Sequence, residues 1–254
     1  MNGCICLLDL KKDATVGLDG QTIVLRTDDF MGVSGLNAGF HLVSIRAHPN
    51  SSIAVGFLVL DTRTPLIRKY DPQTEEVSSQ LVDSLTSKNL LEQMNHGQLP
   101  PTSMVDYSKI VPAEHRQQWQ EQTKFIHDSG VLKLRGLKHG DKVIPGSYQD
   151  DDSSSLTISK TTVDGKSLEY PSIPVVDTTV SLRSNGHAGA KRYLSGMSPS
   201  ERTQLFLEPK LATRLLRDVL RTYYEGNWKA LLGDLQLSYT LFLYLQCLAS
   251  LEHW

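Results

Sequence analysis

The sequence has no excess of basic residues. Lys and Arg number 26 against 28 Asp and Glu, so the formal net charge is −2 at pH 7. Proteins whose main ligand is the phosphate backbone of a nucleic acid usually carry a basic excess, because the release of counterions supplies much of their affinity. The charge balance therefore argues against direct nucleic-acid binding.

Cysteines are equally scarce, with only Cys4, Cys6 and Cys247 in 254 residues. Cys4 and Cys6 are two positions apart in an apolar run, where a strand would place both on one face. A pair of thiolates can begin a metal site, but no CxxC or HxxxH pattern lies close enough to complete it. We interpret the cysteines as small buried apolar residues, typical of a reducing compartment, and expect no metal and no cofactor. No basic residues precede the N-terminal apolar run, so no signal peptide is expected.

Long uninterrupted apolar runs are also missing, even from the most apolar stretch, LLGDLQLSYTLFLYLQCLASLEHW at residues 231–254. A membrane-spanning helix needs about 20 predominantly apolar residues, and Asp234, Gln236 and three further polar residues interrupt this one. We therefore expect no membrane anchor. The polar positions scatter around the helical wheel, which predicts a helix buried inside a bundle. Because only two shorter helices precede it, we expect the bundle to be incomplete and the chain to be truncated at its C-terminus.

What the chain does contain predicts an α+β fold in three parts. Residues 1–145 predict an N-terminal antiparallel β-sandwich-like domain with a few helices, and residues 146–190 a flexible linker rich in Ser and Asp. Residues 191–254 predict an all-α domain that is incomplete. In the first part, short apolar runs alternate with Gly, Pro, Asn and Asp turn signals, which is typical of an antiparallel meander curling into a sandwich or barrel. The runs are CICLLDL, QTIVLR, FHLVSIR, IAVGFLVL and LIRKY.

Helical periodicity appears in four places. One helix is predicted over residues 75–94 and a second over 111–130, with Pro112 near its first turn, Gly130 at its end and Trp119 on its buried side. VLKLRGL at 131–137 predicts a returning strand. In the last part a capping box at 198–201 and the pattern of 211–224 predict helices, and Trp228 opens the final one after a break at Gly226.

The linker offers two candidate phosphorylation sites. Ser147 is followed three residues later by Asp150, and Thr161 by Asp164, an arrangement that acid-directed kinases favour. Added phosphate would alter how the linker docks. The alternative is an ordinary solvated acidic loop. A strand-like piece is expected around residues 175–182.

No constellation in the sequence predicts catalysis. The patterns GxSxG, HExxH and GxxxxGK[ST] are absent. Asp128, Ser129 and Gly130 spell the triplet of aspartic proteases, in which a dimer pairs two aspartates that share one proton. Asp128 falls at a predicted helix end, however, where this triplet is ordinary C-terminal capping. His41 alternates with apolar neighbours on a predicted strand and is interpreted as a structural histidine.

Three segments together resemble the Aar-two splicing-factor family. VGLDG and DDFMGVSGLNAGFHLV are similar to the family's Gly-Ile-Asp, Phe-x-Gly-Val and Pro-Pro-Gly-x-His-Phe motifs, with Asn37 and Ala38 in place of the two prolines. HRQQWQEQTKFI matches Trp-x-x-x-Thr-x-Phe-Ile, and LLGDLQ resembles a Leu-Gly-Glu-Leu-Gln helix that runs on to Glu-His-Trp. The residues that carry the match are Gly17, Asp19, Phe30, Gly32, Gly39, His41, Trp119, Phe125, Leu232, Gly233, Leu235, Gln236 and Trp254.

The resemblance implies a non-enzymatic pre-mRNA splicing factor. It implies an assembly chaperone that holds the large core protein of the U5 snRNP before mature assembly, in the nucleus and cytoplasm, without direct contact to nucleic acid or membrane. In the family the helical domain continues past Glu-His-Trp, which agrees with the expected truncation. Two alternatives remain: a generic interaction module whose final helix recruits a partner helix, and an aspartic-protease-like enzyme using Asp128.

Overall fold

The computed structural model describes residues 3–48, 55–74, 76–96, 98, 103–144, 162–163, 166–167, 198, 200, 209–247 and 250. Its strands are β1 (Gly3–Leu8), β2 (Thr15–Leu18), β3 (Gln21–Val24), β4 (Gly32–Leu36), β5 (His41–Arg46), β6 (Val55–Val59), β7 (Leu66–Asp71), β8 (Glu76–Ser78), β9 (Met104–Asp106), β10 (Lys142–Ile144), β11 (Thr162–Val163) and β12 (Lys166–Ser167). Its helices are α1 (Ser84–Asn95), α2 (Tyr107–Ile110), α3 (Ala113–Asp128), α4 (Val131–Leu134), α8 (Pro209–Tyr223) and α9 (Trp228–Leu245).

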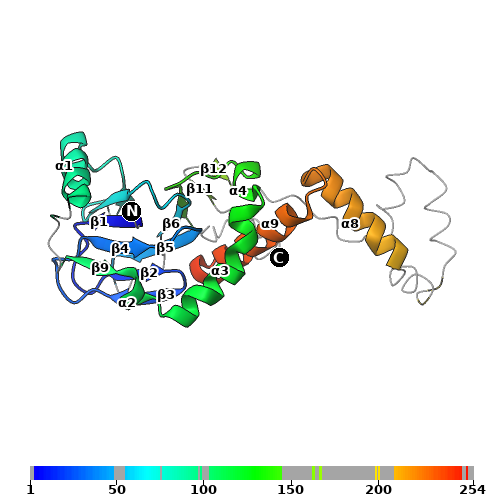
Figure 1. Cartoon of the computed structure of the whole chain (residues 1–254), viewed down its shortest axis with the longest axis horizontal. Coiled ribbons are helices and arrows are strands. Elements are labelled where there is room, and N and C mark those ends of the chain that lie inside the picture. Colours follow the sequence, from blue (N-terminus) through cyan, green and yellow to red (C-terminus); the bar gives the residue numbers. More distant parts are fainter. Residues whose placement is uncertain are drawn as a thin grey trace, which may run out of the picture.

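The strands form two sheets, which confirms the predicted α+β class (Figure 1). One sheet has the order β8-β7-β1-β4-β9, and the other β12-β11-β10-β6-β5-β2-β3. The pairs β1–β7 and β4–β9 are parallel and the other described pairs are antiparallel. The chain changes sheets after β1, β3, β4, β6 and β9, so the predicted sandwich is built by repeated crossing between the two sheets and not by one continuous meander. The core between the sheets includes Ile5, Val16, Phe57 and Tyr70.

Two strands, β2 and β4, are absent from the predicted apolar runs, and both contain glycines. A Cβ atom on Gly17 would stand 2.1 Å from the hydroxyl oxygen of Ser44 on the neighbouring β5. A Cβ atom on Gly32 would stand 1.9 Å from the carbonyl oxygen of Ile5 on β1. These glycines permit close approach inside the sheets, a second use of glycine in strands that a turn-based interpretation misses.

Two predicted elements are wrong in type or extent. The helix expected from residue 75 begins only at Ser84, because Glu76–Ser78 pairs as β8 and the Asp83 carboxylate accepts hydrogen bonds from the first N–H groups of α1. The strand expected at 131–137 contains the short helix α4, which follows Gly130 in a left-handed conformation (φ 78°). The predicted beginning and end of α3, at Pro112 and around Gly130, are confirmed, as are the break at Gly226 and the start of α9 after Asn227.

The cysteines of this fold form no disulfide with one another, and Cys4 and Cys6 have little reactivity. Cys6 and Cys247 are buried, and Cys4 is half-buried. Burial raises the pKa of Cys4 to about 11 and that of Cys6 to about 12, so both thiols are protonated at neutral pH. The interpretation as small buried apolar residues is confirmed for Cys6 and Cys247.

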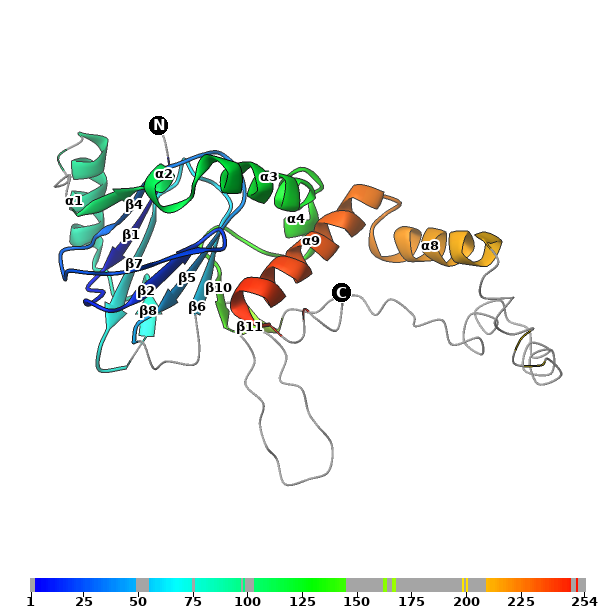
Figure 2. The ribbon, with the colours of Figure 1, turned by 90° about the horizontal axis from the view of Figure 1, so that it is seen from below.

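Helix α9 packs against α3, α4 and the seven-stranded sheet, whereas α8 projects away from both sheets (Figures 1 and 2). The apolar cluster beneath α9 joins Leu237, Leu241 and Leu245 of that helix to Leu42, Leu58 and Trp119 of the N-terminal part. The described residues therefore do not form the helical bundle that was predicted around α9. The helix is apolar on most sides because a sheet covers one side and α3 another. None of the described helices is long and apolar enough to cross a membrane.

The α3–α9 crossing depends on one glycine and one amide. A Cβ atom on Gly233 would lie 2.5 Å from the carbonyl oxygen of Phe125, so only glycine allows this separation of the two helices. One turn further along, the Gln236 carboxamide accepts a hydrogen bond from the Phe125 N–H (2.9 Å) and donates one to the Glu121 carbonyl (3.3 Å). It thus bridges the two backbone groups of α3 that an i→i−4 helical hydrogen bond would join.

Several expectations lie outside the described residues. They are the phosphorylation candidates Ser147 and Thr161, the strand-like piece at 175–182, most of the capping box at 198–201 and the motif residue Trp254. Within the segment expected to be a linker, the structure describes only the β11–β12 pair, which extends the sheet edge at β10.

The variant Gly233→Ala tests whether α3 and α9 approach this closely, because the close approach reverses the usual effect of the change on stability. In an ordinary helix interior this change stabilises by about 1 kcal/mol. Here the added methyl group meets a backbone carbonyl, so we expect the free energy of unfolding to fall by about 1–3 kcal/mol, the usual cost of overpacking. Chemical denaturation of both proteins measures the difference, and a stabilised variant would contradict the crossing.

Candidate functional site

The VGLDG motif places a buried carboxylate in the turn between β2 and β3. Asp19 adopts a left-handed conformation (φ 52°) and is fully buried. Its N–H donates to the Leu42 carbonyl, and its carboxylate accepts the Leu42 N–H, each over 3.0 Å. The turn is thereby fixed to β5 by both backbone and side chain.

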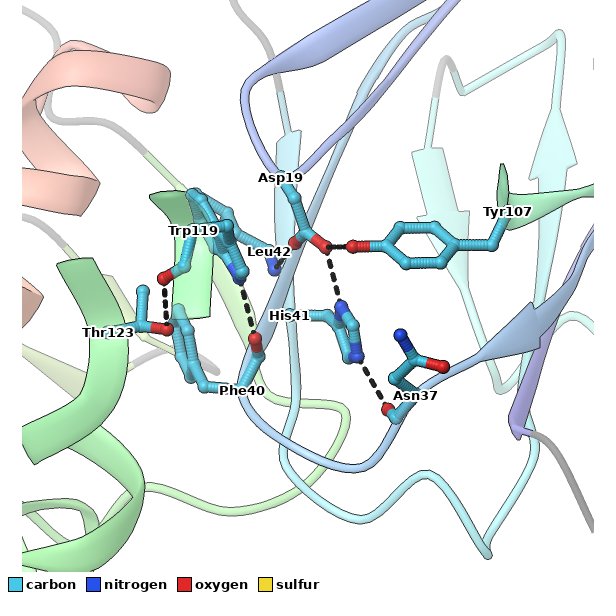
Figure 3. A network of polar contacts seen from close by, with 8 residues as sticks. All are labelled: Asp19, Asn37, Phe40, His41, Leu42, Tyr107, Trp119 and Thr123. Atoms are coloured by element: carbon cyan, nitrogen blue, oxygen red, sulfur yellow. Dashed lines mark hydrogen bonds and ion pairs between the residues drawn. The ribbon is translucent and has the colours of Figure 1, made fainter. Parts of the chain in front are cut away.

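The same carboxylate joins His41 and Tyr107, as Figure 3 shows. The Nδ1 atom of His41 lies 2.6 Å from Asp19 Oδ2, and the Tyr107 hydroxyl donates to that oxygen over 2.7 Å. The His41 Nε2 atom donates to the Asn37 carbonyl over 2.8 Å. Burial by itself would lower the pKa of His41, but the Asp19 charge and these hydrogen bonds outweigh it and raise the pKa. A doubly protonated ring satisfies both oxygen partners, as expected of a structural histidine.

The motif HRQQWQEQTKFI brings α3 onto this cluster. The Trp119 indole N–H donates to the Phe40 carbonyl over 2.8 Å, and the two rings stack with centroids 6.0 Å apart. The Thr123 hydroxyl donates to the Trp119 carbonyl over 2.7 Å (Figure 3). Motif residues that are far apart in the sequence therefore meet at one place.

A pocket of about 230 Å³ opens beside this meeting point. Residues of the β4–β5 loop form one wall and a row of α3 side chains the other, with His41 and Tyr107 between them. The lining residues are Asn37, Ala38, Gly39, Phe40, His41, Tyr107, Trp119, Gln120, Thr123, Lys124 and His127. The pocket offers cationic and hydrogen-bonding groups but no carboxylate, so it suits an anionic group better than a metal ion. The described residues contain no group of three His, Cys, Asp or Glu able to hold a metal.

A second buried polar cluster fixes α9 in place. Arg135, just after α4, donates through Nε to Asp234 Oδ1 (2.9 Å) and through Nη2 to Oδ2. The Tyr224 hydroxyl also donates to Asp234 Oδ2, over 2.7 Å. Burial would lower the pKa of Arg135, but the hydrogen bonds and charge of Asp234 raise it, so the pair stays ionised. Burial followed by the Asp234 hydrogen bond and charge raises the pKa of Tyr224, which remains a neutral donor.

The family-motif residues divide between these locations. Asp19, His41 and Trp119 form the polar cluster, while Gly39 lines the pocket beside it. Gly17 and Gly32 serve close approach within the sheets, and Phe30 lies in the core. Gly233 and Gln236 form the α3–α9 crossing, whereas Leu232 and Leu235 are half-buried on the same helix.

Three partners in the clusters carry no signal in the sequence that would single them out. Tyr107 is 88 positions from Asp19, and Arg135 is 99 from Asp234. Tyr224 is ten positions from Asp234, across the break between α8 and α9. No periodic pattern connects residues so placed, although a lone Asp in an apolar helix is itself a signal that a cationic or donating partner must exist.

Asp128 is the last residue of α3, and the Ser129 N–H at the helix end donates to the Phe125 carbonyl. Gly130 follows in a left-handed conformation. The Asp-Ser-Gly triplet thus ends a helix, as its C-terminal capping interpretation predicts.

Together these observations define an α+β protein made of a two-sheet sandwich with C-terminal helices, the last of which docks on it. Residues 1–136 match the family described as AAR2 N-terminal domain, and residues 188–254 match the AAR2 C-terminal repeat region. Since the first match alone covers more than half of the sequence, the chain belongs to the AAR2 family of splicing factors. A search of curated proteins gives no match. The resemblance noted in the sequence is therefore confirmed.

The His41–Asp19 pair predicts a stability that depends on pH. Folding raises the pKa of His41, so the protonated ring contributes to the free energy of unfolding. That contribution is fully present below the ordinary histidine pKa of about 6.5 and is lost as the pH rises through the pKa of His41 in the folded protein. We expect the stability advantage of the natural chain over His41→Gln to shrink from about pH 6 to pH 9. Denaturation curves across this range measure it, and an advantage that grows with pH would contradict the assignment.

The Arg135–Asp234 pair predicts a non-additive mutant cycle. Asp234→Leu leaves a buried guanidinium without its acceptor, and Arg135→Met leaves a buried carboxylate, so each single change should lower the free energy of unfolding by about 3–5 kcal/mol. The double variant leaves no unpaired charge and should lose less than the sum of the two. Urea denaturation of the four proteins measures the coupling, and strict additivity would show that the pair is not formed.

Proposed function

We propose that this chain is a non-enzymatic assembly chaperone that binds the large core protein of the U5 snRNP. The observation that supports it is membership of a splicing-factor family over both matched regions. The structure adds that the motif residues build a paired, buried framework around a pocket, which is what a binding scaffold needs. The chaperone acts in the nucleus and cytoplasm and leaves before the mature particle forms.

Release of the partner is part of the proposal. Ser147 and Thr161 precede acidic residues in the segment that follows β10. A phosphate adds close to two negative charges at neutral pH and changes which cationic surfaces a segment can reach. Phosphorylation there alters the docking of this segment and so releases the core protein.

Affinity purification of the tagged full chain from nuclear and cytoplasmic extracts tests the partner. We expect the large U5 core protein to co-purify, with mature spliceosomal particles depleted from the same eluate. Mass spectrometry of the bound proteins measures both. Absence of the core protein, with the chain shown to be folded, would contradict the proposal; capture of another helical partner instead would favour the generic interaction module.

Two double variants test whether phosphorylation releases the partner, and a single variant tests the aspartic-protease alternative. Ser147→Asp with Thr161→Asp should recover less core protein than Ser147→Ala with Thr161→Ala, because only the first pair carries the added charge. Asp128→Asn should leave binding unchanged. A peptidase activity that Asp128→Asn abolished would instead support the protease.

A further inference from the structure

A tryptophan at the start of α9 lies on the surface beside α3. The Trp228 side chain is 53% exposed, and its ring centroid lies 5.8 Å from that of the half-buried Phe125. An exposed tryptophan that packs against another ring is pre-positioned for contact, and Trp is among the residues that contribute most to binding interfaces.

Two lysines lie over these rings. Lys124 Nζ is 5.9 Å from the Phe125 centroid, and Lys229 Nζ is 5.8 Å from the Trp228 centroid. Both side chains are exposed, and among the described side chains neither ammonium group pairs with a carboxylate. Among the described side chains of the adjoining segments, Glu121 and Glu225 are also exposed, and they too form no described ion pair. The two ammonium groups beside these rings are therefore accessible to a ligand.

Lys124 connects this aromatic pair to the pocket. It lines the pocket together with His127, while its amine also lies over Phe125, which in turn contacts Trp228. We call Lys124, Phe125, His127, Trp228 and Lys229 the aromatic–basic surface. It combines a small polar recess, two exposed ammonium groups and an exposed ring.

We propose that the aromatic–basic surface binds an acidic peptide segment of a protein partner. A carboxylate of that segment lies at Lys124 and the mouth of the pocket, and an adjacent apolar side chain packs on Trp228. Charge complementarity favours an acidic ligand, because the lining contains the Lys124 ammonium group and no carboxylate. A single-stranded nucleic acid would need a continuous basic groove along its backbone, and a chain of net charge −2 is a poor match for it. The inference stands whichever protein carries the segment.

Selection from a random peptide library displayed on phage, against the immobilised full chain, tests this. We expect enriched peptides to combine Asp or Glu with Trp, Phe or Leu. Their affinity should fall about tenfold in Lys124→Glu and again in Trp228→Ala, as for central interface residues. The matched controls are Lys88→Glu and Leu85→Ala on α1, both exposed and remote from this surface, which should bind like the natural chain.

Several results would overturn the aromatic–basic surface as a peptide-binding site. They are a failure to enrich peptides, enrichment without an acidic bias, and binding that is indifferent to Lys124→Glu. So would an oligouridine RNA that bound the natural chain and lost affinity in the same variants. Thermal unfolding of Lys124→Glu, whose side chain is exposed, confirms that lost binding is not lost folding. Loss of U5 core-protein binding with peptide binding intact would overturn the proposed function but leave this inference standing.

Discussion

A single buried negative charge organises the part of the protein in which the motifs meet. An ionised carboxylate without partners would cost several kcal/mol to remove from water. Asp19 therefore requires the Leu42 N–H, the His41 ring and the Tyr107 hydroxyl to be in place together. These come from β5 and α2, so the buried turn after β2 is stable only when both neighbours are in place. The hydrogen bond from His41 to the Asn37 carbonyl also fixes the β4–β5 loop.

A second set of constraints fixes α9 to the sandwich, and its chemistry differs. Leu237 and its neighbours supply apolar area without much directional preference. Gly233 sets how closely the helices approach, and Gln236 and Asp234 set the register along α3 and α4. Burial holds α9 on the surface, while the polar contacts decide where on that surface it lies. The described C-terminal helix is thus an integral part of the N-terminal structure.

Features encoded in neighbouring residues could be predicted, and features that join distant residues could not. Asn227 caps α9 and Gly130 ends α3 because capping involves only a few adjacent backbone groups. The strands β2 and β4 were missed because their glycines, which permit close packing, interrupt the apolar runs by which strands are predicted. The neighbours of α9 were missed because α3 lies roughly a hundred positions earlier in the chain. At the candidate site, the motifs indicated Asp19 and His41, but nothing local indicated Tyr107.

The Gln236 carboxamide has a consequence for the order in which the chain folds. It occupies the hydrogen-bonding positions of the Phe125 N–H and the Glu121 carbonyl, across a separation of 111 and 115 residues. During synthesis, α3 therefore leaves the ribosome before the side chain that bridges these two groups has been made. Contacts this far apart in sequence form late and slow folding, because a long loop must close first. Until then the face of α3 that packs on α9 remains without its partner helix.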